Sequence, residues 1–187
     1  MRVRLSLLAG SLVAVALALW ADGPGLSDRA LLAALGAVAA LLLVLHGLWQ
    51  HLRRPPLRWI VVDGSNVMHW DANVPGLAVV AEVLAGLTQR GFHPVVWFDA
   101  NAGYKVADRY MGPDALARHL PIPASRIFVA PKGTPADPLL LDSALRLGAR
   151  VVTNDRFRDW TEAHPQVTQP GFLVPGTARD GAVHLHI

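Results

Sequence analysis

The chain has 187 residues, of which 52% are hydrophobic and only 17% are charged, and it contains no Cys. This composition is too apolar for a disordered chain, and the length suits about one ordinary domain. The lack of Cys excludes a disulfide framework, a Cys-based zinc site, an iron–sulfur centre and a cysteine nucleophile. The formal net charge is +3, yet from His51 onward 14 Lys and Arg stand against 12 Asp and Glu. The folded part is therefore nearly neutral, and the excess basic charge lies beside the apolar N-terminal end.

Two uncharged runs, at residues 5–21 and 30–50, come first in the chain. Each approaches the roughly 20 apolar residues that a membrane-crossing helix needs. Residues 22–29 between them are rich in turn-forming Gly, Pro, Ser and Asp, and are able to reverse the chain. We therefore expect two transmembrane helices that form a hairpin over residues 1–50, anchored in the lipid bilayer.

Basic residues flank this hairpin on both outer sides: Arg2 and Arg4 before it, and Arg53, Arg54 and Arg58 after it. The positive-inside rule then places both outer ends, and the domain that follows, in the cytoplasm. The 15 Arg against 2 Lys are typical of a GC-rich bacterium, so the expected location is the bacterial inner membrane, with a multi-pass topology. The alternative is a secretory signal peptide over residues 2–21.

Residues 51–57 contain Arg-Arg-Pro-Pro and are expected to form a juxtamembrane linker, because Pro ends a helix. In residues 58–187, short β-branched runs then alternate with helical patterns, which predicts βαβ units and a largely parallel sheet. The expected strands are 59–62, 94–98, 127–129 and 151–153, with final edge strands at 172–174 and 183–187. The expected helices are 77–89, 115–119 and 138–147.

Three of the expected strands run directly into acidic residues, which are Asp63, Asp99 and Asp155. In an open α/β sheet, ligands bind outside the carboxyl ends of the strands. Asp is also a poor strand residue, and a carboxylate at a strand end has to be solvated or neutralised. These acids are therefore expected to converge on one cleft.

Three segments together resemble the NYN branch of the PIN-like nucleases, and most closely the Regnase-type ribonuclease domain. The segments are Asp63-Gly-Ser-Asn66 after an apolar strand, Asp137, and Thr153-Asn-Asp155-Arg-Phe-Arg-Asp159-Trp160. The resemblance covers residues 58–160. It implies a PIN-like, three-layer α/β fold with a mostly parallel central sheet, and an endoribonuclease that depends on Mg2+ or Mn2+. The matching positions make Asp63, Asp137, Asp155 and Asp159 the catalytic and metal-binding acids.

The animal relatives of this family carry a Cys/His zinc finger, which a chain without Cys cannot form, so no zinc is expected. RNA is the expected partner. Eight further residues are expected to bind or position it: Ser65, Asn66, Asp99, Tyr104, Lys105, Asn154, Arg156 and Arg158. Hydroxyl and amide groups next to Asp63 suit the orientation of a carboxylate or phosphate, and the cations suit RNA phosphates.

Each acid also has a structural interpretation. Asp63 is able to form an Asx-turn at a strand end, and Asp137 before Pro138 is able to cap a helix. If residues 156–160 form one helical turn, Asp155 and Asp159 share a face, and their repulsion calls for Mg2+ or for Arg156 and Arg158. Asp142 is assigned to a surface ion pair with Arg146.

Two other functions stay open. One is a membrane-tethered RNA-binding or scaffold module on a catalytically inactive PIN-like fold. Convergence of all four matched acids within metal-sharing distance would distinguish an enzyme from such a module. The other, an α/β phosphatase, is weaker, because Asp63-Gly-Ser lacks a second acid two residues later. The sequence leaves the RNA target, the number of metal ions and the oligomeric state, a homo-oligomer included, undetermined.

Overall fold

The computed structural model describes residue 13 and residues 28–52, 56–179 and 182–187. The chain divides into two compact units, one ending at Pro56 and the other running from Leu57 to Ile187. Each unit is described by itself below.

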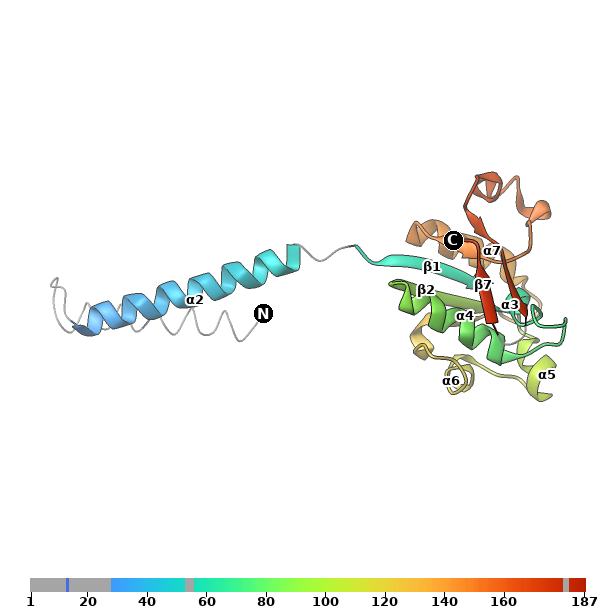
Figure 1. Cartoon of the computed structure of the whole chain (residues 1–187), viewed down its shortest axis with the longest axis horizontal. Helices are drawn as coiled ribbons and strands as arrows, with labels where there is room; N and C mark the ends of the chain where they lie inside the picture. The colour runs from blue at the N-terminus through green and yellow to red at the C-terminus, as the bar shows by residue number, and fades with distance from the viewer. Residues whose placement is uncertain (1–12, 14–27, 53–55, 180–181) are drawn as a thin grey trace. The chain divides into compact units, whose positions relative to one another are not determined.

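In the first unit, helix α2 (Asp28–Leu52) covers the second expected span and continues two residues into the expected linker (Figure 1). Many of its aliphatic side chains are exposed, including Leu32, Leu35 and Leu42. In the part of the chain that the structure describes, no helix is long and apolar enough to cross a membrane. The first expected span lies outside the described residues, apart from residue 13. The transmembrane hairpin therefore stays a prediction.

The second unit is built on a five-stranded sheet in the order β3-β2-β1-β4-β5, and all four neighbouring pairs are parallel. Its strands are β1 (Arg58–Asp63), β2 (Phe92–Phe98), β3 (Ile127–Val129), β4 (Arg150–Val152) and β5 (Leu173–Val174). The helices are α3 (Gly64–Val67), α4 (Leu77–Gln89), α5 (Ala102–Ala107), α6 (Pro113–Leu116) and α7 (Ala136–Leu147). Short 3-10 helices lie at η1 (Ala124–Arg126), η2 (Arg158–Trp160) and η3 (Pro165–Thr168).

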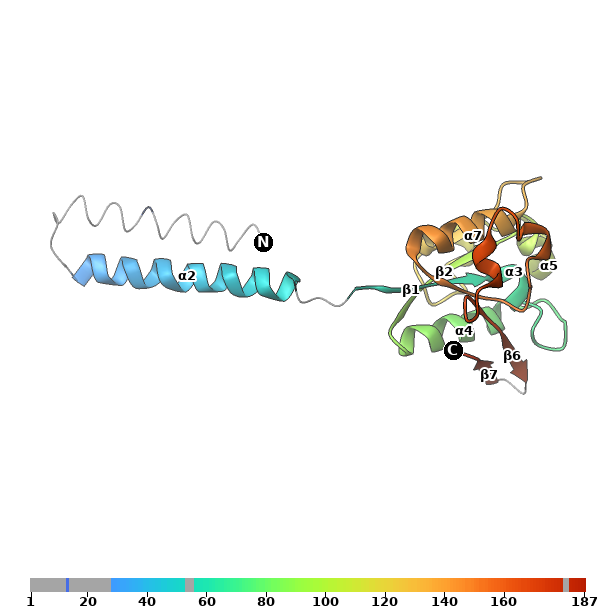
Figure 2. The ribbon, with the colours of Figure 1, turned by 90° about the horizontal axis from the view of Figure 1, so that it is seen from above.

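Helices cover both faces of the sheet, with α7 on one side and α4 on the other (Figure 2). Successive side chains of a strand point to opposite faces, so Ile60 and Val62 join the core cluster that includes α4, and Val61 joins the cluster that includes α7. Every residue of both clusters lies between Trp59 and Leu185. The domain thus has its own hydrophobic core, and the expected α/β fold with a mostly parallel central sheet is confirmed.

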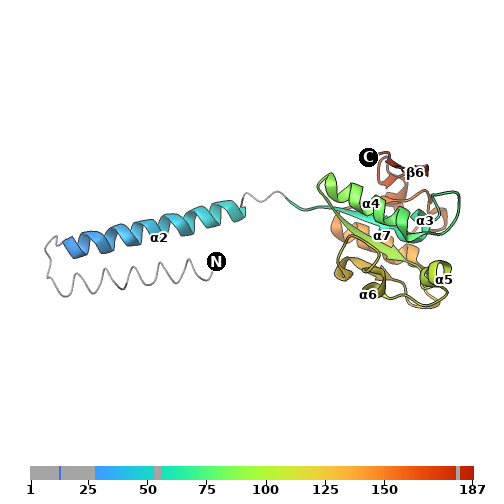
Figure 3. The same cartoon turned by 60° about the horizontal axis from the view of Figure 1, so that its bottom comes forward.

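The edge strand expected at 172–174 is confirmed as β5, but the last strand differs from the prediction. The strand expected at 183–187 is β7 (Ala182–Leu185), which pairs antiparallel with β6 (Gly176–Arg179) in a separate two-stranded sheet. This hairpin packs against α4 rather than extending the central sheet, as the views in Figures 1 and 3 agree. The prediction that residues 183–187 extend the edge of the central sheet was wrong. Alternation of apolar residues indicates a half-buried strand, but it does not indicate the sheet to which that strand belongs.

Candidate active site at the carboxyl ends of the strands

Asp63 is the last residue of β1 and caps the short helix α3 that follows it. It is only 8% exposed. Its Oδ1 accepts a hydrogen bond from the backbone N–H of Asn66 at 3.0 Å, and its Oδ2 accepts one from the Thr153 hydroxyl at 2.9 Å. The backbone of the next residue, Gly64, packs closely against Phe98, since a Cβ on Gly64 would lie 2.5 Å from the Phe98 ring. Instead of the Asx-turn considered above, Asp63 thus forms a helix cap, and its role at a site stays a prediction.

The electrostatics of Asp63 set it apart from an ordinary cap. Burial raises its pKa to about 7, well above the usual value of 3.8 for Asp, and the nearby charges of Asp137 and Asp99 raise it as well. The hydrogen bonds from Asn66 and Thr153 oppose that rise. Burial disfavours the charged form of this carboxyl, and a cation bound beside it would favour that form.

Asp137 faces the same region from α7. Partial burial raises its pKa, as do the charges of Asp155, Asp99 and Asp159, whereas a hydrogen bond from Trp160 lowers it. The Trp160 indole N–H donates to Asp137 Oδ2 at 3.2 Å. The expected N-cap role is wrong in detail, because α7 begins at Ala136 and Asp137 lies inside its first turn.

Asp155 and Asp159 are both exposed and do not share one helical turn. Phe157 between them has a left-handed backbone, with φ of 49°, and the 3-10 helix η2 begins only at Arg158. Asp155 instead forms a local turn in which its Oδ1 accepts the backbone N–H of Phe157 at 2.8 Å. The expectation of one helical turn over 156–160 was therefore wrong. Both acids nevertheless act on Asp137 through their charges.

Asp99 belongs electrostatically with the acids, although the sequence placed it among the substrate-binding residues. It follows β2 directly, and its backbone N–H donates to the Ser65 hydroxyl at 2.8 Å. Its charge raises the pKa of both Asp63 and Asp137. The carboxyl ends of β1 and β2 and the start of α7 thus bring three acids to one edge of the sheet.

Polar residues expected to bind substrate also hold this edge together. Asn66 Oδ1 accepts the Trp70 indole N–H at 2.8 Å and the backbone N–H of Asn154 at 3.0 Å. The Asn154 side chain exchanges two hydrogen bonds with the backbone of Gly176, at 2.9 and 3.1 Å, which ties the β6–β7 hairpin to the site. Ser65 is engaged as well, with Asp99. These contacts give the three residues a positioning role, and contact with substrate stays a prediction.

Cations expected to bind RNA are exposed. Lys105 on α5 lies with its Nζ 3.3 Å from His69 Nε2, and the neighbouring Tyr104 is 55% exposed. Arg156 and Arg158 are exposed too.

Asp142 was expected to form an ion pair with Arg146. Among the described residues its carboxylate is paired instead with His164, whose Nε2 lies 4.0 Å away.

Thr153 and Trp160 are the contributors that sequence reasoning left without a role. Thr153 is 1% exposed; its hydroxyl donates to Asp63 and accepts from the backbone N–H of Asp155 at 3.0 Å, so it links the two acids. Trp160 fixes Asp137 in the same way. Both stand in the motif from Thr153 to Trp160, but only the folded chain reveals which acid each one holds.

The donor set has the chemistry that Mg2+ prefers, since it consists of carboxylate, hydroxyl and amide oxygens. Among the described residues, however, no group of three or more His, Asp or Glu lies close enough to hold a metal ion. In this part of the chain the four matched acids are thus not gathered into one such group. Mg2+ is usually held by one or two carboxylates together with water and substrate phosphates, so the residues present fit such an ion.

Comparisons with known proteins agree with this architecture. The model of the Zc3h12a-like ribonuclease NYN domain matches residues 56–170. The nuclear proteinaceous RNase P 2 of Arabidopsis thaliana has a similar fold, with a TM-score of 0.54 and 17% identity over 70% of this chain and 30% of that one. A second structure of that protein gives a TM-score of 0.51 and 18% identity over 80% of this chain and 34% of that one. None of the curated proteins compared matches the chain.

The chain spans about a third of the length of those RNase P structures, so the likeness concerns the fold of one domain. The family match is stronger evidence for what the chain is, because it covers more than half of the chain and includes every acid described above. The resemblance of the sequence to NYN nucleases is confirmed: the chain belongs to the Zc3h12a-like ribonuclease NYN domain family.

Proposed function

We propose that residues 58–187 form an endoribonuclease that uses Mg2+ or Mn2+ to cleave RNA phosphodiester bonds. The observation that carries the proposal is the buried carboxyl of Asp63, whose pKa is raised to about 7 while Asp99 and Asp137 act on it. Such an arrangement is costly unless a cation is bound, and unneutralised acids cluster at functional sites more often than elsewhere. Membership in a ribonuclease family supports RNA as the substrate.

Asp63 and Asp137 are the residues that would hold the ion, with Asp155 and Asp159 supplying outer negative charge. A bound Mg2+ would polarise the scissile phosphate and make an attacking water more acidic. Thr153 and Trp160 keep the two inner carboxylates oriented through their hydrogen bonds. The exposed side chains of Arg156, Arg158 and Lys105 would bind RNA phosphates, and Tyr104 would stack on a base.

A cleavage assay on mixed RNAs tests this function directly. The domain from Leu57 to Ile187 should cleave with Mg2+ or Mn2+ and should stop in EDTA. The same ions should raise its midpoint of thermal unfolding, because an ion that binds only the folded state stabilises it. An unchanged midpoint together with no cleavage of any RNA would instead favour the RNA-binding or scaffold module on an inactive fold.

Membrane anchoring is a separate part of the proposal. It rests on the uncharged runs at 5–21 and 30–50, on the flanking arginines, and on the exposed aliphatic side chains of α2. We infer a bacterial inner-membrane protein whose nuclease domain is cytoplasmic. A reporter fused after Ile187 should be active only if it works in the cytoplasm. Activity of a strictly periplasmic reporter would favour the secretory signal peptide.

A further inference from the structure

Two arginine side chains lie near one aromatic ring at the amino end of the sheet, opposite the acids, and a third arginine lies beside them. The Arg58 guanidinium lies 4.2 Å from the centre of the Phe92 ring, and that of Arg150 lies 5.9 Å from it. Arg58 also donates to the backbone carbonyl of Arg90 at 3.5 Å. Arg58, Arg90 and Phe92 line one shallow hollow together. We call Arg58, Arg90 and Arg150 the arginine cluster.

The cluster carries three positive charges with no acidic partner among the described residues. Within residues 56–179 and 182–187, no carboxylate lies within ion-pair distance of any of the three; the ion pair found there joins His164 and Asp142. Like charges held this close repel one another, and contact with the Phe92 ring offsets only part of that cost. The surface is therefore suited to a partner that brings several negative charges.

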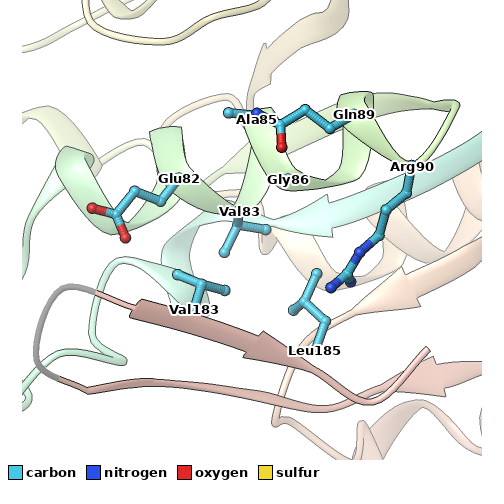
Figure 4. Close-up of a pocket in the computed structure, with 8 residues that line it drawn as sticks. All are labelled: Glu82, Val83, Ala85, Gly86, Gln89, Arg90, Val183 and Leu185. Atoms are coloured by element: carbon cyan, nitrogen blue, oxygen red, sulfur yellow. The ribbon is translucent and has the colours of Figure 1, made fainter.

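Aliphatic side chains border the cluster. The hollow of Arg58 and Arg90 is also lined by Leu185 and Ile187. Ile187 is 44% exposed, and Leu57, the residue before Arg58, is 56% exposed. Arg90 and Leu185 also line a neighbouring groove of about 290 Å³ between α4 and β7, with Glu82 farther along it (Figure 4).

We propose that the arginine cluster binds the headgroups of an anionic lipid bilayer, with Leu57 and Ile187 entering the interface beside it. Basic side chains flanked by aliphatic ones are the pattern of an interfacial membrane-binding surface. Arg58 follows Leu52, the last residue of α2, by only six positions, and Arg53 and Arg54 stand between them in the sequence. The proposed anchor and Arg58 thus belong to one stretch of basic sequence, which Arg90 and Arg150 join through the fold.

RNA is the less suitable partner for this surface. Single-stranded RNA binds through exposed aromatic stacking surfaces, whereas Phe92 is buried and lies beneath Arg58. The cluster and the acids also lie at opposite ends of β1, which at about 3.3 Å per residue places Arg58 about 17 Å from Asp63. A bilayer on the arginine cluster would leave the acid end free for RNA.

Vesicle sedimentation of the Leu57–Ile187 domain, which has its own core, tests the inference without the anchor, RNA or metal. The probes are vesicles of phosphatidylcholine alone and vesicles with equal parts of phosphatidylglycerol. We expect binding only to the anionic vesicles and a loss of binding as salt rises. Each arginine near a charged membrane surface contributes about fivefold, so R58Q/R90Q/R150Q should bind about a hundredfold more weakly.

The matched control R109Q/R118Q/R146Q removes the same charge at exposed positions elsewhere and should bind anionic vesicles like the parent. Arg90→Gln alone, at an exposed position, should still lose about fivefold if the triple variant unfolds. Equal binding by parent and cluster variants would overturn the inference. It would also be overturned if the cluster variants kept vesicle binding and lost RNA affinity. Neither result depends on whether the domain cleaves RNA.

Discussion

The two ends of the central sheet carry opposite charge. At the carboxyl end, Asp63 is the last residue of β1 and Asp99 follows β2 directly, and the charges of Asp99 and Asp137 act on the Asp63 carboxyl. At the amino end, Arg58 begins β1 and Arg150 begins β4, and both guanidinium groups lie near the Phe92 ring. Neither group neutralises the other, because a strand's length separates them.

This difference shows why the nearly neutral charge of the domain says little about its partners. Acids and bases form local ion pairs in many protein surfaces, but here Asp63, Asp99 and Asp137 lie at one end of the strands and the arginine cluster lies at the other. Each group has charge of one sign, which favours a ligand of the other sign. The acid end calls for a cation and the amino end for an anion. The predictions below test whether the acid end behaves as a site.

Removal of the Asp63 charge should have the largest effect. Asp63→Asn keeps the size and an acceptor for the Asn66 N–H, but it removes the charge that would hold the ion. RNA cleavage should fall by at least about a hundredfold with the fold intact. Asp142→Asn, an acid on the distant part of α7, is the control and should cleave at nearly the parent rate. Equal rates for both variants would remove the acid end as the site.

The stability of the metal-free domain should depend on pH through the same residue. The pKa of Asp63 is about 7 in the folded domain against the usual 3.8 for Asp, so burial of its ionised form lowers stability progressively as pH rises between these values and toward pH 8. Between pH 5 and pH 8 this group should lower the free energy of unfolding by roughly 2 to 3 kcal/mol. Chemical denaturation of the parent and Asp63→Asn at both values measures the effect.

A comparison of the parent with Asp63→Asn at the two pH values can contradict this prediction. Asp63→Asn should show a smaller loss of stability from pH 5 to pH 8 than the parent, because the variant has no charge to bury. If both proteins lose the same stability, Asp63 ionises as an exposed acid does, and the electrostatic difference between the two ends is weaker than its burial indicates.

Trp160→Phe should have a smaller effect than loss of Asp63. Phe retains most of the packing but removes the hydrogen bond to Asp137, so the pKa of Asp137 should rise further. About five- to tenfold more Mg2+ should then be needed for half-maximal cleavage, while the rate at saturating Mg2+ stays within about threefold. A fall in the saturating rate with no change in Mg2+ requirement would mean that Trp160 acts only through packing.

The smallest effect is expected from the exposed cations. Arg156→Gln and Arg158→Gln should each weaken RNA binding by a few fold, and should reduce the slope of log affinity against log salt by roughly 0.7. Arg118→Gln, an exposed arginine outside the acid end, should leave both quantities unchanged. An unaltered salt slope in Arg156→Gln and Arg158→Gln would mean that these arginines do not contact RNA phosphates.

Much of the fold followed from the sequence because the strands and long helices are strongly patterned. The helix expected at 77–89 matches α4 and the strand expected at 127–129 matches β3. Short elements were missed: α3 and α5 hold too few residues to show a helical period. The β6–β7 hairpin lies outside the central sheet because it packs against α4. This contact joins segments far apart in the sequence, so no local sequence pattern predicts it.

For the site, strand-end positions identified Asp63 and Asp99 as neighbours, since parallel strands bring their carboxyl ends together. The relation of Asp155 to Asp159 was not predictable, because it depends on the left-handed backbone of Phe157, a conformation that such a bulky residue rarely adopts. The roles of Thr153 and Trp160 depend on contacts across the fold. The arginine cluster was hidden for the same reason, since its members are far apart in sequence.

Location of a bound Mn2+ ion tests the central claim most directly. Crystals of the Leu57–Ile187 domain soaked in Mn2+ should give an anomalous difference peak within coordination distance of the Asp63 carboxylate, on the side that faces Asp137. The same soak of Asp63→Asn crystals should lose that peak. A peak at another site, or none at the carboxyl ends of β1 and β2 with the metal at saturating concentration, would contradict a metal-dependent nuclease centred on Asp63.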